Sequence, residues 1–168
     1  MIKLKWLAVL VCFLILVQPC FAAGSAKKLV GTWKLVSFEV VWQATGEREL
    51  PFGKNPTGYL IFTPQGRMMV LLTAEGRKVA RQAVQTDQDR ADLYKSMFAY
   101  TATYRVEGDK IIAKFDVAHT PEWIGCEVMQ LFKIDGDRLQ ITTMYVAPTP
   151  RPDKKGPARL ITTYERAK

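Results

Sequence analysis

The chain has 168 residues, of which 48% are hydrophobic and 24% are charged, and its formal net charge is +8. This length suits one domain with its own core, and no internal repeat, low-complexity segment or second domain is visible in it. Because the 24 basic residues are spread along the chain, the charge does not predict a nucleic-acid partner.

Residues 1–22 have the pattern of a secretory signal peptide. Lys3 and Lys5 precede an unbroken apolar run of 12 residues, Trp6 to Val17. That run is shorter than the ~20 residues that a membrane span needs, so it favours a cleaved leader over an anchor. We expect cleavage after Ala22, which leaves 146 residues with a net charge of +6, in the periplasm or outside the cell.

The three cysteines divide between the leader and the domain. Cys12 and Cys20 belong to the predicted leader, so Cys126 is the one cysteine of the mature chain and no internal disulfide can form. We expect Cys126 to be a small buried hydrophobic residue. Lipidation of Cys20 is the weaker alternative, because residues 17–19 lack the small residue that such processing prefers.

The first predicted strand covers residues 29–41, in which the residues alternate between two faces. We expect Trp33 and Leu35 to share one face and Val36 and Phe38 to share the other. After a polar loop over residues 43–56, two apolar runs form a hairpin, "TGYLIFT" and "RMMVLLT". Pro64-Gln65-Gly66 supplies the residues of its turn.

One helix is predicted over residues 87–98. Thr86 or Asp87 can cap its amino end, and acidic residues follow in the first turn. We expect the helix to lie over one end or one side of the sheet. Its apolar residues fall at helical spacing and are Ala91, Leu93, Tyr94, Met97 and Phe98.

Five further strands complete the chain. Gly108-Asp109 joins "YTATYRV" to "KIIAKFDVA", and Gly136-Asp137 joins "CEVMQLFKI" to "RLQITTMYV"; both dipeptides are strong hairpin signals. A Pro- and Lys-rich loop then leads to the closing strand "ARLITTYERA". Eight antiparallel strands in hairpin order can close into a barrel that holds side chains or one small ligand. The predicted fold class is therefore an all-β, eight-stranded antiparallel barrel with one short helix.

The common enzyme signatures are absent from the sequence. His119 is the one histidine and no cysteine pair exists, so the residues predict no metal site and no cofactor. The glycines are scattered at turns and form no phosphate-binding loop, and no serine stands in a nucleophile-elbow context.

Aromatic and hydroxyl side chains on the strand faces form the main functional signal. They fill a solid core in one interpretation and line a largely apolar ligand cavity in the other. We favour the cavity, because a mixture of Ala, Thr, Tyr and Met suits a pocket better than a tight aliphatic core. We expect one face of a strand to carry Ile111, Ala113, Phe115, Val117 and His119. The predicted ligand-binding residues are Tyr59, Tyr100, Tyr104, Phe115, Gln130 and Tyr145.

The most distinctive loop runs from His119 to Gly125 and also has two interpretations. It is either a rim with an acid–base pair, His119 and Glu122, or a turn in which Trp123 plugs one end of the barrel. We favour the turn.

Four segments resemble the bacterial and fungal lipocalin-like domain family: "LVGTWKLVSFE", "PFGKNPTGYLIFTPQGRM", "YRVEGDKI" and "PEWIGCEVMQLFKIDGDRLQITT". The resemblance covers residues 28–166, nearly the whole mature chain. It implies an eight-stranded lipocalin-type barrel, which the count of strands also predicts. Many family members carry histidines near the positions of Ala113 and Lys114 and an arginine at Gln130, and these departures favour a binding protein over an enzyme.

The resemblance also implies a structural role for Gly31, Trp33 and Arg166. In lipocalins, the tryptophan of the Gly-x-Trp motif packs across the closed end of the barrel against an arginine of the last strand. A guanidinium over an indole contributes ~0.5–2 kcal/mol. We therefore expect the motif to identify the fold and to contact no ligand.

We expect an exported monomer that binds a small hydrophobic or amphipathic ligand inside the barrel, and that does not insert stably in a membrane once its leader is removed. Two alternatives stay open. The first is an isomerase or cyclase that acts on a polyketide-like substrate, with tyrosine hydroxyls or His119 and Glu122 moving protons. The second is a solid barrel that serves as an envelope interaction module, with the basic loop 147–157 as its contact.

Overall fold

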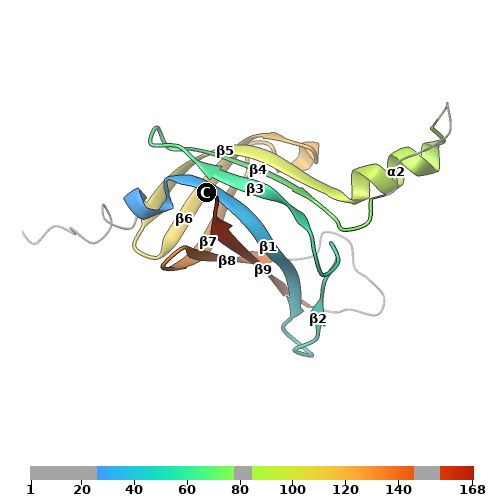
Figure 1. The fold of residues 1–168 in the computed structure, drawn as a ribbon, viewed down its shortest axis with the longest axis horizontal. Coiled ribbons are helices and arrows are strands. Elements are labelled where there is room, and N and C mark those ends of the chain that lie inside the picture. The colour runs from blue at the N-terminus through green and yellow to red at the C-terminus, as the bar shows by residue number, and fades with distance from the viewer. Residues whose placement is uncertain (1–25, 78–84, 146–155) are drawn as a thin grey trace, which may run out of the picture.

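The computed structural model describes residues 26–77, 85–145 and 156–168. Nine strands form one antiparallel sheet in the order β2-β1-β3-β4-β5-β6-β7-β8-β9, and β1 also pairs with β9. That last pairing closes eight of the strands into a barrel (Figure 1). The predicted fold class, an eight-stranded antiparallel barrel with one short helix, is confirmed. The strands are β1 (Gly31–Trp42), β2 (Arg48–Glu49), β3 (Thr57–Phe62), β4 (Arg67–Thr73), β5 (Met97–Glu107), β6 (Lys110–Ala118), β7 (Glu127–Asp135), β8 (Arg138–Tyr145) and β9 (Ala158–Arg166).

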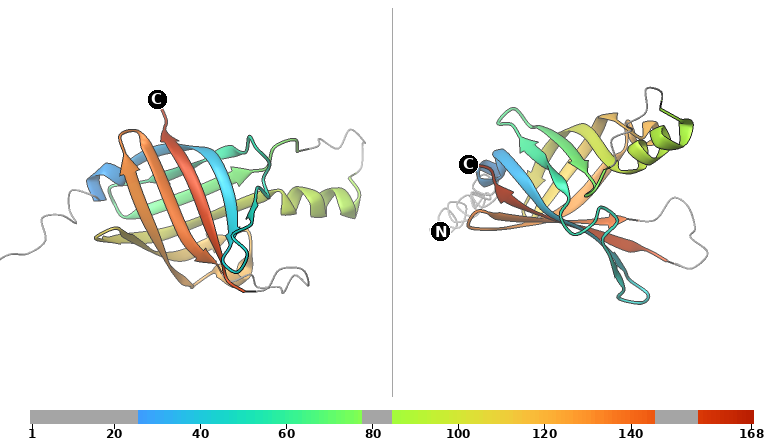
Figure 2. Two further views of the ribbon diagram at one scale, coloured as in Figure 1. Left: turned by 90° about the horizontal axis from the view of Figure 1, so that it is seen from below. Right: turned by 45° about the vertical axis from the view of Figure 1, so that its right-hand side comes forward.

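The hairpin turns lie where the glycines predict them. Gly66, Gly108 and Gly136 have φ values of 75°, 62° and 56°, in the left-handed region that residues other than glycine rarely adopt. Each of the three connects consecutive strands of the barrel wall, whose tilted arrangement Figure 2 shows from two further sides. The loop after β1 holds the short extra strand β2, which pairs Glu49 with Val40 on β1.

Two β-bulges change which side chains face the barrel interior. The pairing of β1 with β9 shifts register between Leu35 and Ser37, so Trp33 and Phe38 are both buried although strict alternation separates them. The pairing of β5 with β6 shifts between Thr101 and Ala102, and Val117 is consequently 60% exposed. The prediction that Val117 shares the inner face with Phe115 is therefore wrong.

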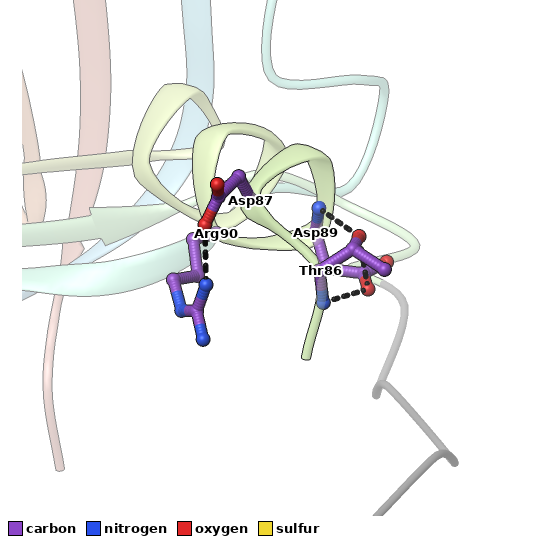
Figure 3. A network of polar contacts seen from close by, with 4 residues as sticks. All are labelled: Thr86, Asp87, Asp89 and Arg90. Carbon is purple, nitrogen blue, oxygen red and sulfur yellow. Dashed lines mark hydrogen bonds and ion pairs between the residues drawn. The ribbon is translucent and has the colours of Figure 1, made fainter. Parts of the chain in front are cut away.

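Helix α2 (Asp87–Lys95) is three residues shorter than predicted, because Met97 and Phe98 already belong to β5. Its amino end carries a reciprocal capping box (Figure 3): Asp89 N–H donates to Thr86 Oγ1 over 3.1 Å, and Thr86 N–H donates to Asp89 Oδ2 over 2.9 Å. Arg90 pairs with Asp87 at 2.5 Å. No residue of α2 is buried, and the helix extends outward from one end of the barrel instead of covering it.

The two ends of the barrel differ. At one end, residues 26–29 form a turn of helix beside the carboxyl terminus; α2 lies at the opposite end (Figures 1 and 2). The 3₁₀ helix η1 (Pro121–Trp123) lies in the loop that follows β6. The buried side chains near the carboxyl terminus include Leu29, Trp33 and Leu139, and they belong to an apolar core that continues along the barrel. The other end remains accessible, which decides where a ligand can enter.

Candidate functional site

The barrel encloses a cavity of about 520 Å³, within the range of small-molecule sites in proteins. Every strand of the barrel wall except the short β2 contributes to its lining. Most of the lining side chains are aliphatic or aromatic, and Lys95 at the end of α2 is the one Lys, Arg, Asp or Glu among them in the described part of the chain. The barrel is therefore hollow, with an interior that suits an uncharged molecule.

Aromatic rings surround the mouth of the cavity. Phe38 stacks on Phe52 with centroids 4.5 Å apart and planes inclined by 10°. Trp123 of η1 lies 5.1 Å from Phe98 and 5.2 Å from His119, measured between ring centroids. All five line the cavity. We call these residues the aromatic rim, and such rings can pack against a planar apolar ligand.

Polar groups also line the cavity, on four different strands. They are Tyr100 on β5, Gln130 on β7, Thr143 on β8, and Thr162 and Tyr164 on β9. Gln130 Nε2 donates a hydrogen bond to Thr143 Oγ1 over 3.0 Å, across the register pair that joins β7 to β8. We call these five residues the inner polar cluster.

Burial makes ionisation of the two tyrosines of the inner polar cluster harder than usual. It raises the pKa of Tyr164 to about 12, against the smaller opposite effect of a hydrogen bond with Thr162. Burial also raises the pKa of Tyr100, and the adjacent Tyr164 adds to this rise. A hydrogen bond with the Gln130 side chain lowers the same pKa by less. Both phenols therefore stay protonated at neutral pH, as hydrogen-bonding groups without charge.

At the closed end of the barrel, Trp33 contacts Arg166 and Leu29. The guanidinium carbon of Arg166 lies 4.2 Å from the centre of the Trp33 ring, and the two residues are paired in register across β1 and β9. Trp33 Nε1 donates to the Leu29 carbonyl over 2.8 Å. Gly31 has a φ of 131°, and a side chain there would approach Arg166 Nη1 to 3.0 Å. None of these three predicted structural residues lines the cavity.

Sequence comparison agrees with this architecture. The lipocalin-like domain profile matches residues 30–167. The chain belongs to the lipocalin-like domain family. No curated protein matches the sequence. Among solved structures, the chain is similar to one titled "Structure of EF1p2_mFAP2b bound to DFHBI", with 12% identity and a TM-score of 0.43 over 88% of this chain and 98% of that one.

The cavity of this lipocalin-like protein includes three of the six residues that the sequence singles out for ligand binding. Tyr100, Phe115 and Gln130 line it together. Tyr104 does not line it, which corrects the expectation for this residue: its ring packs against Phe62 and its hydroxyl donates to the Thr63 carbonyl over 3.1 Å. The Tyr145 side chain lies outside the described residues, as does most of the predicted contact loop 147–157.

Tyr59 lies on the outer surface of the barrel and is 49% exposed. Its neighbours Leu60 and Phe62 are buried instead, and alternation along β3 then turns Tyr59 outward. The expectation that Tyr59 faces the ligand cavity is corrected accordingly. In the sequence, the run "TGYLIF" fits either face equally well, so only the register of β3 against β1 decides it.

The loop after β6 forms part of the cavity mouth. His119 and Trp123 line the cavity, whereas Glu122 is exposed and does not, so an acid–base pair of His119 and Glu122 inside the cavity lacks its second member. Cys126 is exposed, which corrects the expectation of a buried thiol. Its thiol donates to the Glu122 carbonyl over 3.5 Å, because the loop turns back on itself at this point.

Several cavity residues escape prediction from the sequence, among them Phe52, Phe98, Thr162 and Tyr164. Two of them carried a usable signal. Thr162 and Tyr164 are four and two residues before Arg166 on the same strand, so the expected contact of Arg166 with Trp33 also turns them inward. Phe52 and Phe98 carried no such signal. Phe52 belongs to the polar loop, and the spacing of Phe98 fits a helix.

In the described residues, no group of three or more His, Cys, Asp or Glu side chains could hold a metal ion. No helix within the same ranges is long and apolar enough to cross a membrane.

Proposed function

We propose that this lipocalin-like protein is an exported, monomeric carrier that binds a small apolar or amphipathic molecule in its barrel. The observation that supports this most directly is the cavity of about 520 Å³, whose lining includes the aromatic rim and the inner polar cluster. Apolar walls favour binding by burial of ligand surface, at roughly 25 cal/mol per Å². The few polar groups orient the ligand.

Ligand binding is tested with the full chain, purified from the cells that express it. Organic extracts are examined by mass spectrometry for a co-purified molecule, and the protein is titrated with the neutral fluorescent probe N-phenyl-1-naphthylamine. We expect saturable probe uptake at one site per chain. An empty extract together with no uptake of the probe would count decisively against a carrier.

A cavity-filling variant tests whether the probe binds inside the barrel. Val128→Trp adds an indole to the cavity lining and is expected to weaken probe binding about tenfold or more, since it removes space the probe must occupy. Met129→Trp is the matched control, because the adjacent residue on β7 is 47% exposed and faces away from the cavity. Equal losses in both variants would contradict binding inside the barrel.

Export is tested separately. The pattern of residues 1–22 supports removal of a leader, so the mature protein should begin at residue 23. Intact-mass measurement of protein from the periplasm or medium checks this, and size-exclusion chromatography with light scattering checks the monomer. A full-length mass would contradict the proposal of cleavage.

A further inference from the structure

The loop over residues 50–56, between β2 and β3, carries Phe52 to the mouth of the cavity. Phe52 is 7% exposed and lines the cavity, where it stacks on Phe38. Phe38 and Phe98 of the aromatic rim belong to strands of the barrel wall, so the hydrogen bonds of the sheet hold their backbones. Phe52 lies in no strand, and its position at the mouth therefore depends on the contacts of its loop.

Glu75, which lies just after the end of β4, holds this loop in place. Its carboxylate accepts hydrogen bonds from the backbone N–H groups of Lys54 and Asn55, over 2.9 Å and 3.1 Å. It accepts a third hydrogen bond from Asn55 Nδ2 over 2.7 Å. The backbone N–H of Glu75 donates in turn to the Phe52 carbonyl over 2.8 Å. One residue thus joins the loop to the barrel through four hydrogen bonds.

The backbone of the loop is shaped for this contact. Gly53 has a φ of 81°, and a β-carbon there would lie 2.7 Å from Glu75 Oε2, so only glycine allows so close an approach. The hydrogen bonds with Asn55, and then the one with Lys54, hold the pKa of the Glu75 carboxyl below its usual range. The carboxylate is therefore ionised at neutral pH, and hydrogen bonds to an ionised acceptor are stronger than those between neutral groups.

We infer that residues 50–56 form a gate at the mouth of the cavity, and that Glu75 is the positioning residue that keeps Phe52 at the mouth and so sets the rate of ligand exchange. This inference rests on the proposed carrier function and adds its kinetic control. The gate opens when the Glu75 carboxylate releases Lys54 and Asn55. No strand of the barrel has to separate in that step, so it is a local opening.

Glu75→Gln tests the gate in the full-chain protein. The variant keeps the size of the side chain, but it removes the charge and replaces one acceptor oxygen with an NH₂ group, which cannot accept. Stopped-flow fluorescence of N-phenyl-1-naphthylamine at several protein concentrations gives the association and dissociation rate constants. We expect both to rise about fivefold or more while Kd stays within about twofold, because the open form becomes more populated and the closed form still predominates.

Unchanged rate constants in Glu75→Gln would overturn the inference, and so would a weaker Kd with an unchanged association rate constant. Glu122→Gln is the matched control, because it makes the same change at an exposed carboxylate that does not line the cavity. Its rate constants should equal those of the wild type. Gly53→Ala disturbs the same contact from the loop side and should accelerate exchange as Glu75→Gln does.

A double variant tests whether Glu75 acts through Phe52. Phe52→Ala removes the ring from the mouth and should itself accelerate exchange. Adding Glu75→Gln to Phe52→Ala should then change the rate constants by less than about twofold, since the carboxylate has no ring left to position. Independent effects that multiply would contradict this route.

Failure of the two proposals is distinguishable. If N-phenyl-1-naphthylamine binds the wild-type protein saturably and Glu75→Gln exchanges it at the wild-type rate, the carrier stands and the gate is wrong. If the probe does not bind the wild-type protein, the carrier fails and the gate fails with it.

Discussion

Among the residues that the structure describes, Gly58 is the one whose backbone most strictly requires glycine. It lies within β3, paired with Leu72, and has a φ of 148°. A β-carbon there would clash with the Leu71 carbonyl oxygen and would approach Leu72 Cα to 2.7 Å. Two neighbouring strands meet at this glycine more closely than any other residue allows.

We therefore expect Gly58→Ala to lower the free energy of unfolding by about 2–4 kcal/mol, through backbone strain and displacement of β4. The measurement is the midpoint of urea unfolding. Gly46→Ala is the control, because Gly46 also has a positive φ, 69°, but a β-carbon there meets nothing within 4 Å. Similar midpoints for the two variants would argue against the close approach of β3 and β4.

Gln130 illustrates at the same scale how the fold decides whether a polar side chain faces the interior of the barrel. In the sequence it is one polar residue within an apolar strand, "CEVMQLFKI". It lines the cavity because β7 turns it inward, where its amide donates to Thr143 Oγ1 over 3.0 Å.

At the scale of the element, α2 is an appendage of the barrel. None of its residues is buried, Tyr94 donates to the His119 carbonyl over 2.9 Å, and its capping box, visible in Figure 3, is the main local feature that specifies where it begins. A helix of nine residues is marginal in water without tertiary packing. Its stability should therefore respond to its cap while the barrel does not.

Thr86→Ala removes the side-chain acceptor for the Asp89 amide, which is expected to cost about 1 kcal/mol of helix stability. Hydrogen exchange of the α2 amides should accelerate about fivefold, since helix opening is a local event. The temperature of global unfolding should stay the same. Gln85→Ala, one residue earlier and outside the capping box, is the control; a large shift in global unfolding for Thr86→Ala would contradict an independent helix.

The β-hairpins show which parts of the fold are locally encoded. Glycines with positive φ at 66, 108 and 136 specify tight turns, and apolar runs of the right length flank each of them. Each hairpin can therefore be predicted without knowing the rest of the barrel. The two bulges cannot, because they arise where β1 meets β9 and where β5 meets β6, and the register of those pairs depends on the partner strand.

At the scale of the whole molecule, the contact of Arg166 with Trp33 ties the last strand to the first. Arg166 also donates to the carbonyls of Lys28 and Val30, over 2.8 Å and 3.2 Å. One side chain thus holds the turn of helix at residues 26–29, the first strand and the last strand together. Barrel closure and the sealing of one end rest on the same group.

Arg166→Met should lower the unfolding temperature by about 5 °C, because a cation–π contact and two hydrogen bonds to carbonyls together contribute about 2 kcal/mol. Probe binding should persist, since Arg166 does not line the cavity. Calorimetry and the probe titration check the two parts. Arg159→Met changes an exposed arginine of the same strand and is the control. Loss of binding with no loss of stability would contradict a structural role.

The sequence predicted only part of the candidate site. The sequence predicted that Tyr100, Phe115 and Gln130 face one interior, and all three do. It misplaced Tyr59, because a strand with apolar residues on both faces gives no sign of which face is inside, and Val117, because the bulge between β5 and β6 reverses its direction. It also missed Phe98, whose spacing fits a helix equally well and which the pairing of β5 with β4 places in a strand.

The sequence alone determined the family, the strands and their turns, since these depend on local residue patterns and on motifs such as Gly31-Thr32-Trp33. Tertiary structure decided which faces of the strands turn inward and that the barrel is hollow. The physical reason is that side-chain direction in a strand has a period of two, so a single bulge or a shift of one residue reverses it. Such shifts are set by partners distant in the chain.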